Sequence, residues 1–213
     1  MKRNNVFKFG MLINIIPFIM GGIYYNQLPE TMATHFDFNN HANGFSSKPM
    51  ALFGIPMILV LVYILAYFFT SQDPKRSNQN EKVVAFVLVI IPILNLIVSG
   101  MIISVNLGNK VDIGLIINIF IGILFTGLGN YMPKIKRNYT IGIRLPWTLD
   151  NDYIWDKTHR FAGYIWSIGG IIYLIAAFFL KDYSHYFIPV IILILTAIPT
   201  VYSYMIYRSF KRG

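Results

Sequence analysis

Two groups of side chains in this sequence have the types and spacing that metal or acid–base chemistry needs. His35, Asp37 and His41 lie close together in the chain, and two imidazoles with a carboxylate are ligands that zinc accepts. Asp152, Asp156 and His159 are spaced so that they share one face of a helix, as a general acid and base would. The elements that carry these residues decide whether either group does chemistry.

Neither group comes with the further residues that its chemistry requires. The histidines do not form H-E-x-x-H or another fixed metal spacing, and a polar loop with a turn at Asn43–Gly44 accounts for the same residues. No nucleophile, glycine-rich phosphate loop or complete metal set accompanies the second group. We therefore predict no enzymatic activity, no metal and no cofactor, and retain His35, Asp37 and His41 as the residues to test for a metal.

The elements around these residues are apolar stretches long enough to cross a bilayer. Hydrophobic residues make up 55% of the 213 residues and charged residues 13%, which exceeds what one soluble core can bury. A span needs roughly 20 mostly apolar residues. Six stretches come near that length: residues 7–25, 50–70, 83–106, 113–132, 161–180 and 187–207. We predict an all-α, polytopic membrane protein whose six transmembrane helices form three hairpins, the last two closed by short loops at 107–112 and 181–186.

Basic residues give the expected orientation. Fifteen of the 18 Lys and Arg residues fall on one side of this topology and three on the other, so the positive-inside rule places both termini in the cytoplasm. The formal charge of +9 then reflects topology and contact with anionic lipid, and no DNA-reading motif accompanies it. The bilayer is thus the expected partner, and no direct nucleic-acid binding is expected.

The topology divides the chain into three parts. Residues 1–70 form an N-terminal helical hairpin with an extracellular loop at 26–49, and residues 71–82 form a polar, solvated cytoplasmic linker. Residues 83–213 form a four-helix membrane domain that contains a polar cytoplasmic segment at 129–163. In that segment, residues 138–147 read as an irregular stretch at the membrane interface, and a helix begins near Asp152 after N-cap candidates at 148–152.

The spans themselves contain few polar groups. Spans two to six have no Asp, Glu, Lys, Arg or His clearly inside them, which argues against a proton- or sodium-driven carrier. The sequence does place four amides at this depth, each of which needs a partner in lipid: Asn14, Asn95, Asn106 and Asn118. These amides either pack helices together or line a substrate pathway.

Two motifs resemble known families. The pattern in the 26–49 loop resembles a bacterial module that forms the first hairpin of many small membrane proteins; its residues here are Leu28, Pro29, His35, Phe36, Asp37, Gly44 and Lys48. The run GN…P…N…GIRLPWTL…W…THR resembles the C-terminal signature of the SdpI immunity-protein family. The matching residues are Gly129, Asn130, Pro133, Asn138, Gly142, Arg144, Pro146, Trp147, Thr148, Leu149, Trp155, Thr158, His159, Arg160 and Gly163.

The second resemblance implies a function. It implies an integral membrane protein that protects the cell from a secreted killing peptide on its outer face and that recruits a small transcriptional repressor to its inner face. The signature residues would then serve the fold or the docking of that partner. Two alternatives remain open: a small transporter or exporter of a peptide or lipid-like substrate, and a membrane enzyme that uses the outer His and Asp residues.

Overall fold

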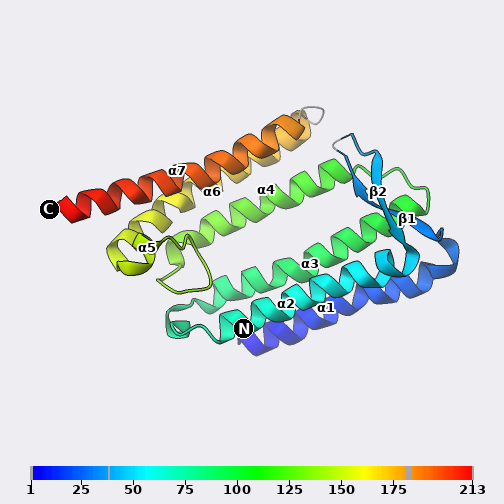
Figure 1. Cartoon of the computed structure of the whole chain (residues 1–213), viewed down its shortest axis with the longest axis horizontal. Helices are drawn as coiled ribbons and strands as arrows, with labels where there is room; N and C mark the ends of the chain where they lie inside the picture. Colours follow the sequence, from blue (N-terminus) through cyan, green and yellow to red (C-terminus); the bar gives the residue numbers. More distant parts are fainter. Residues whose placement is uncertain (1, 38, 181–183, 213) are drawn as a thin grey trace. The chain divides into compact units, whose positions relative to one another are not determined.

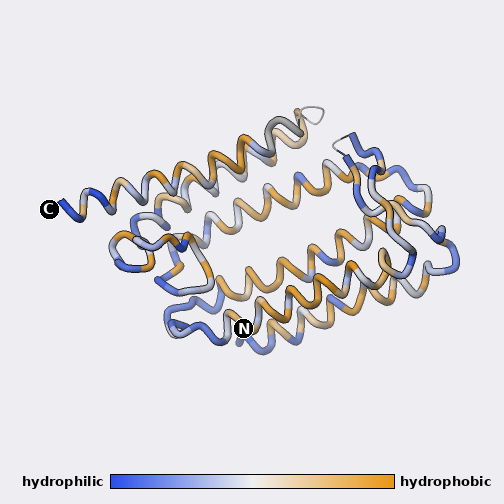
Figure 2. Tube along the Cα trace, viewed as in Figure 1, coloured by the Kyte–Doolittle hydropathy of each residue, from blue (hydrophilic) through white to orange (hydrophobic). Residues whose placement is uncertain are grey.

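Long apolar helices make up most of the protein. The computed structural model describes residues 2–37, 39–180 and 184–212. Within this described part, six helices are long and apolar enough to cross a membrane (Figure 1). They are α1 (Arg3–Tyr24), α2 (Ile55–Ser71), α3 (Glu81–Asn106), α4 (Ile113–Tyr131), α6 (Asp152–Phe179) and α7 (Ser184–Arg212). Hydrophobic residues lie along these helices and polar residues lie at their ends (Figure 2), so the predicted polytopic helical fold is confirmed.

The chain forms two compact units. The first unit contains Met1–Phe69 and Val84–Gly114, and the second contains Thr70–Val83 and Leu115–Gly213. Most of α3 therefore belongs with α1 and α2, whereas the sequence grouped it with the later spans. The expected short loop between α3 and α4 is present at residues 107–112. In the expected 181–186 loop, residues 181–183 lie outside the described residues, and the division into three domains stays a prediction.

Amide and phenol groups join the helices of the first unit. Asn95 Nδ2 donates to Asn14 Oδ1 at 2.8 Å and to the carbonyl of Pro56 at 3.3 Å, linking α3 to α1 and α2. The hydroxyl of Tyr63 on α2 lies 3.2 Å from the carbonyl of Val6 on α1. Tyr63 fits there because Gly10 of α1 has no side chain to meet its ring. Buried hydrogen bonds therefore fix the register of three helices that dispersion alone would leave free to slide.

A β-hairpin lies in the first unit between α1 and α2. Strands β1 (Thr31–Phe36) and β2 (Ala42–Ser47) pair antiparallel, between the short turns η1 (Tyr25–Gln27) and η2 (Met50–Gly54). The sequence predicted only a polar loop here, with its turn at Asn43–Gly44, and that position is wrong. The chain reverses between Asp37 and His41, where Asn40 adopts a φ of 63°, and Gly44 lies within β2 opposite His35. Asn tolerates this left-handed conformation better than most residues do.

Glycines bring α4 and α6 of the second unit into close contact. A Cβ on Gly122 would lie 2.5 Å from Leu174, and one on Gly170 would lie 2.5 Å from the backbone nitrogen of Thr126. Gly129, seven residues later in α4, approaches Ser167, and Gly163, seven residues earlier in α6, approaches Pro133. Small residues at this spacing let two helix backbones approach where a larger side chain would hold them apart.

A proline determines how α7 is held in the second unit. Pro199 has no N–H, so the carbonyl of Leu195 loses its partner within the helix. Trp166 of α6 donates its indole N–H to that carbonyl at 2.7 Å. Tyr173, also on α6, donates its hydroxyl to Asn118 of α4 at 2.7 Å. Polar contacts therefore tie α6 to both of its neighbours, in a region where unpaired groups would be costly.

Short elements occupy the polar ends of the second unit. They are η3 (Arg76–Asn78), η4 (Met132–Lys134) and α5 (Pro146–Asp150), and residues 135–145 are irregular. The irregular stretch predicted at 138–147 is confirmed up to Leu145 and is wrong at Pro146 and Trp147, which begin α5. Asn151 caps α6, since its side chain accepts from the backbone N–H of Tyr153 at 2.8 Å. The predicted helix start near Asp152 is confirmed.

Candidate functional site

The candidate residues from the sequence fall into two regions, one in each unit. We call residues 129–163 the signature segment and residues 26–49 the hairpin segment. The signature segment contains a cluster of hydrogen-bonded polar groups, and the hairpin segment contains the residues considered for metal binding.

His159 and Trp155 are the centre of the signature segment. His159 of α6 is only 1% exposed, and its ring stacks on that of Trp155 with centroids 4.0 Å apart. The N–H of Ile143 lies 2.9 Å from Nε2 of His159, and Nδ1 of the same ring lies 2.8 Å from the carbonyl of Trp155. Because Nε2 must accept and Nδ1 must donate, the imidazole is neutral in a single tautomer.

Gly142 is the residue that makes this contact possible. Its φ of +121° belongs to a region that side chains rarely adopt. A Cβ at this position would overlap Nε2 of His159 and lie 3.0 Å from Cζ2 of Trp155. The glycine, the histidine and the tryptophan of the signature are therefore one packing unit, which accounts for their occurrence together in the sequence.

Asn138 and Thr148 hold the two ends of the irregular loop. The carboxamide oxygen of Asn138 accepts from the backbone N–H of Ile141 at 2.7 Å, and its Nδ2 donates to the carbonyl of Lys136 at 2.9 Å. Thr148 Oγ1 accepts from the N–H of Leu145 at 2.9 Å, at the first turn of α5. Both side chains are buried, and both replace hydrogen bonds that regular structure would have supplied.

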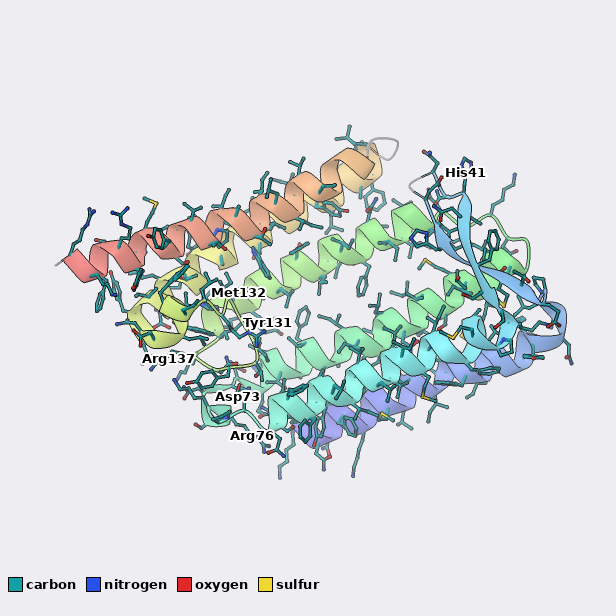
Figure 3. The ribbon with its side chains drawn as sticks, viewed as in Figure 1. His41, Asp73, Arg76, Tyr131, Met132 and Arg137 are labelled. Carbon is teal, nitrogen blue, oxygen red and sulfur yellow. The ribbon has the colours of Figure 1, made fainter. Side chains whose placement is uncertain are left out.

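Asp73 connects this loop to the polar linker before α3. Its Oδ2 accepts from Thr140 Oγ1 at 2.7 Å, from the N–H of Tyr139 at 3.0 Å and from Gln79 Nε2 at 3.0 Å. The backbone N–H of Lys75 donates to its Oδ1 at 2.7 Å. Figure 3 shows Asp73 beside the loop that also carries Arg137.

The predicted solvated linker is therefore wrong at Asp73 and Gln79. Both side chains are buried, and Asp73 is only 5% exposed. Burial on its own would raise the pKa of Asp73, but hydrogen bonds from Thr140, Lys75, Tyr139 and Gln79 outweigh it and lower the pKa below its ordinary value. The available signal was an Asp-Pro step followed by amides, which is typical of a side-chain-capped turn.

The cationic signature residues lie at the surface around this cluster. Arg144 is exposed, and its guanidinium donates to the carbonyl of Tyr139 at 2.6 Å. Arg137 lies against α6, where its Nε is 2.6 Å from Asp152 Oδ1. Arg160 and Lys136 are exposed, and so are Lys134 and Lys157. Lys134 lies over the ring of Tyr131 at 5.1 Å and Lys157 over that of Tyr153 at 5.6 Å.

The remaining signature residues serve helix contacts or lie exposed. The indole N–H of Trp147 donates to Ser203 on α7 at 2.9 Å, and Pro146 opens α5. Pro133 meets Gly163, as described above, while Asn130 is exposed near the end of α4. Thr158 is fully buried, and its hydroxyl has no hydrogen-bond partner among the described residues.

The second group considered for acid–base chemistry is not assembled. Asp152 pairs with Arg137 and Asp156 is exposed, whereas His159 is buried with both ring nitrogens bonded to backbone groups. A base needs a free nitrogen within reach of a substrate proton, and His159 offers none. The three residues lie on one helix, but their side chains do not come together as an acid–base site.

The motif residues of the hairpin segment have structural contacts. Lys48 is buried, donates to Glu30 Oε1 at 2.8 Å and lies 4.8 Å from the ring centre of Tyr25. His35 Nδ1 lies 2.6 Å from Asn43 Oδ1, and Gly44 is required because a Cβ there would lie 2.8 Å from Cβ of His35. Pro29 is exposed just before β1.

The metal candidates do not meet in one place. Asp37 Oδ1 accepts from the backbone N–H of His41, Oδ2 lies 3.6 Å from His41 Nδ1, and His35 is bonded to Asn43. The hydrogen bond from His41 lowers the pKa of Asp37 against the opposing effect of burial. Figure 3 shows His41 at the tip of the hairpin. Within the described residues, no three His, Cys, Asp or Glu side chains are placed to hold a metal ion.

Two comparisons with known proteins agree on where this chain belongs. Residues 134–203 match the SdpI/YfhL protein family. The immunity protein SdpI of Bacillus subtilis (strain 168) is 32% identical to this chain over 214 residues, which cover 98% of each chain. Residues 12–60, which include the whole hairpin segment, match a domain of unknown function (DUF1648). No solved structure matches the chain.

Proposed function

The chain belongs to the SdpI/YfhL protein family, and from that premise we propose that it is a membrane immunity protein that protects its cell against a secreted antimicrobial peptide. The observation that carries this proposal is the similarity to an immunity protein along the whole chain, 98% of both sequences. Such a match includes both polar segments and all six helices, and not the signature alone.

The proposed topology assigns different roles to the two polar segments. With 15 of the 18 basic residues on one side, the signature segment faces the cytoplasm and the hairpin segment faces outward. A secreted peptide then meets the hairpin segment first. Arg144, Arg160 and Lys136 are exposed cations of the signature segment, and their charge supports docking of a small transcriptional repressor on the inner face.

The amides of the spans do not favour the transporter alternative. Asn14 and Asn95 bond to each other, and Asn118 accepts from Tyr173. Asn106 bonds to the backbone of Ala33. A pathway for a polar substrate needs groups that are free to exchange partners, and these amides hold structural elements together instead.

A survival assay tests the immunity role. Wild-type protein is expressed in a bacterial strain that lacks its own immunity protein, and cells are challenged with a panel of secreted killing peptides. The panel includes the peptide countered by the B. subtilis relative. Survival above that of the empty-vector strain is expected for at least one peptide. Unchanged sensitivity to every peptide, at verified protein levels, would refute the proposal.

Orientation is tested by labelling single introduced cysteines. The chain has no cysteine of its own, so any label reports only the introduced position. Ser47→Cys in the hairpin segment should react with a membrane-impermeant maleimide on intact cells. Lys136→Cys in the signature segment should react only after the cells are opened. The reverse pattern would place the termini outside.

The repressor role is tested with the double variant Arg144→Ala and Arg160→Ala. It should lower the amount of a co-expressed repressor, encoded beside the gene, that is recovered with the membrane.

A further inference from the structure

The two edges of the β-hairpin differ in how their backbone groups are satisfied. In an antiparallel pair, residues alternate between those whose N–H and C=O point at the partner strand and those whose groups point away from it. The N–H of Lys48 donates to the carbonyl of Glu30 at 2.8 Å, which fixes that pair as the inward-pointing kind. The register Thr31–Ser47, Met32–Ser46 and Ala33–Phe45 then makes Thr31, Ala33, Phe45 and Ser47 outward-pointing.

On the outer edge of β1, one side chain pairs with the backbone of Ala33. Asn106 of α3 accepts from the N–H of Ala33 at 2.8 Å and donates to the carbonyl of Ala33 at 2.9 Å. A carboxamide that makes both bonds replaces the peptide group of a neighbouring strand. This contact also confirms that the backbone groups of Ala33 point away from β2, as the register requires.

The outer edge of β2 has no such partner. Within the described residues, Phe45 and Ser47 make no hydrogen bond on their outward side. Their N–H and C=O groups repeat at the two-residue spacing of a strand, about 6.8 Å. The strand ANGFSS also contains no charged residue or proline, the features that usually protect an exposed edge.

Only one kind of molecule matches this edge along its length. An extended polypeptide presents alternating N–H and C=O groups at the same repeat, so it can add to β2 as a third strand. Phe45, whose side chain is 61% exposed, offers an apolar contact on one face of the added strand. Glu30 and Asp37 against Lys48 give residues 26–49 a formal charge of −1, which favours a peptide with excess Lys or Arg.

We propose that an extended segment of a secreted peptide adds as a third strand to the free edge of β2, at Phe45 and Ser47. The segment contains both apolar and cationic residues. The identity of that peptide as the killing peptide rests on the proposed function. The chemistry of recognition rests on the edge alone. Main-chain hydrogen bonds supply affinity, and Phe45 supplies the contact that selects an apolar side chain.

Amide hydrogen exchange on the wild-type chain gives the first test. The full-length protein in nanodiscs is mixed with each synthetic killing peptide of the panel, and binding and exchange are measured together. Peptide binding should slow exchange at Phe45 and Ser47 and leave Ser46 unchanged, because the Ser46 N–H already lies in the ladder. Binding that leaves Phe45 and Ser47 unprotected, or no binding by any peptide, overturns the proposal.

A proline substitution gives the second test. Ser47→Pro removes one outward N–H and no ladder hydrogen bond, and an edge strand accepts proline at such a position. Peptide affinity should fall about tenfold, as expected for the loss of one hydrogen bond that leaves its acceptor unpaired. Ser47→Ala, which keeps the N–H, should bind like wild type. Equal affinity of Ser47→Pro and wild type overturns strand addition.

Two further outcomes are informative. If Ser47→Cys forms disulfide-linked dimers without peptide, the edge pairs with a second copy of the chain and the proposal is wrong. The survival assay separates the two proposals: full protection by Ser47→Pro overturns strand addition alone. Peptide bound at Phe45 and Ser47 without protection by the wild-type protein overturns the immunity role alone.

Discussion

The signature segment and the hairpin segment are both polar stretches between apolar helices, yet they satisfy their backbone groups differently. In the signature segment, side chains that are far apart in sequence complete the hydrogen bonding of an irregular loop. His159 accepts from the N–H of Ile143, and Asp73 accepts from the N–H of Tyr139. In the hairpin segment, Asn106 bonds to the backbone of Ala33 on the outer edge of β1, whereas no described residue bonds to the outer edge of β2 at Phe45 and Ser47.

This difference separates residues that identify a fold from residues that meet a ligand. The polar groups of His159 and Asp73 are already bonded within the second unit, so these residues act on stability and not on a ligand. An open strand edge contributes little to stability but has unused hydrogen-bonding capacity. The most recognisable residues of the sequence therefore belong to the less reactive region.

The largest effect that would test this comparison is expected at Gly142. Gly142→Ala places a Cβ against His159 and Trp155 at a φ of +121°, so it should destabilise the protein by about 3 kcal/mol or more. Gly108→Ala is the matched control, because Gly108 has a φ of +87° but nothing within 4 Å of a Cβ. Thermal unfolding in detergent measures both. Equal losses at the two glycines would show that packing against His159 has no part in the effect.

Asp73→Asn should have the next largest effect, about 2 kcal/mol, because an amide cannot accept all the hydrogen bonds of the buried carboxylate. The folded-state pKa is below the ordinary 3.8, so the stabilisation is complete above that pH and is lost as pH falls through the lower folded value. Unfolding measured from pH 6 to about pH 3 should show a loss in wild type that Asp73→Asn lacks. Parallel curves would contradict this.

A smaller effect, about 1 kcal/mol, is expected at Trp166. Its indole N–H donates to the carbonyl of Leu195, which has no helical donor because residue 199 is proline. Trp166→Phe should destabilise wild type, but it should cost less in a Pro199→Ala background, where the new N–H can pair with Leu195. A double-mutant cycle of unfolding free energies measures the coupling. Additive losses would mean that the tryptophan acts through its ring and not through this hydrogen bond.

The smallest losses of stability are expected for Arg144 and Lys75, the two cationic residues that contact Tyr139. Arg144→Ala removes a hydrogen bond to the Tyr139 carbonyl and should cost up to about 1 kcal/mol. Lys75→Ala removes only an exposed cation–π contact 5.2 Å from the ring centre and should cost less, about 0.5 kcal/mol. Protein level and survival are measured together. A greater loss at Lys75 would reverse the roles assigned to these residues.

Local patterns in the sequence were enough for the helices and for part of the signature segment. A span needs only apolar length, because lipid surrounds it whichever neighbour it packs against, and the six spans follow from composition. The N-cap before Asp152 and the irregular stretch near Gly142 also follow from residue types that act on their own neighbours.

Long-range partners could not be read in the same way. Asp73 is bonded to residues more than 60 positions away, so its burial depends on a loop that the linker sequence does not contain. The hairpin was missed because strand pairing depends on register, and Ala42–Ser47 has neither β-branched residues nor a clear alternation. The turn at Asn43–Gly44 was wrong because Gly44 is needed for its contact with His35.

The sequence by itself determined that this chain is a six-span membrane protein of a recognisable family, since hydropathy and a contiguous signature are properties of the chain alone. Only the tertiary structure decided which polar groups are used up and which remain available. That outcome depends on partners brought from distant positions: Asn106 bonds to Ala33 on one edge of the hairpin, and among the described residues the opposite edge at Phe45 and Ser47 is left without a partner.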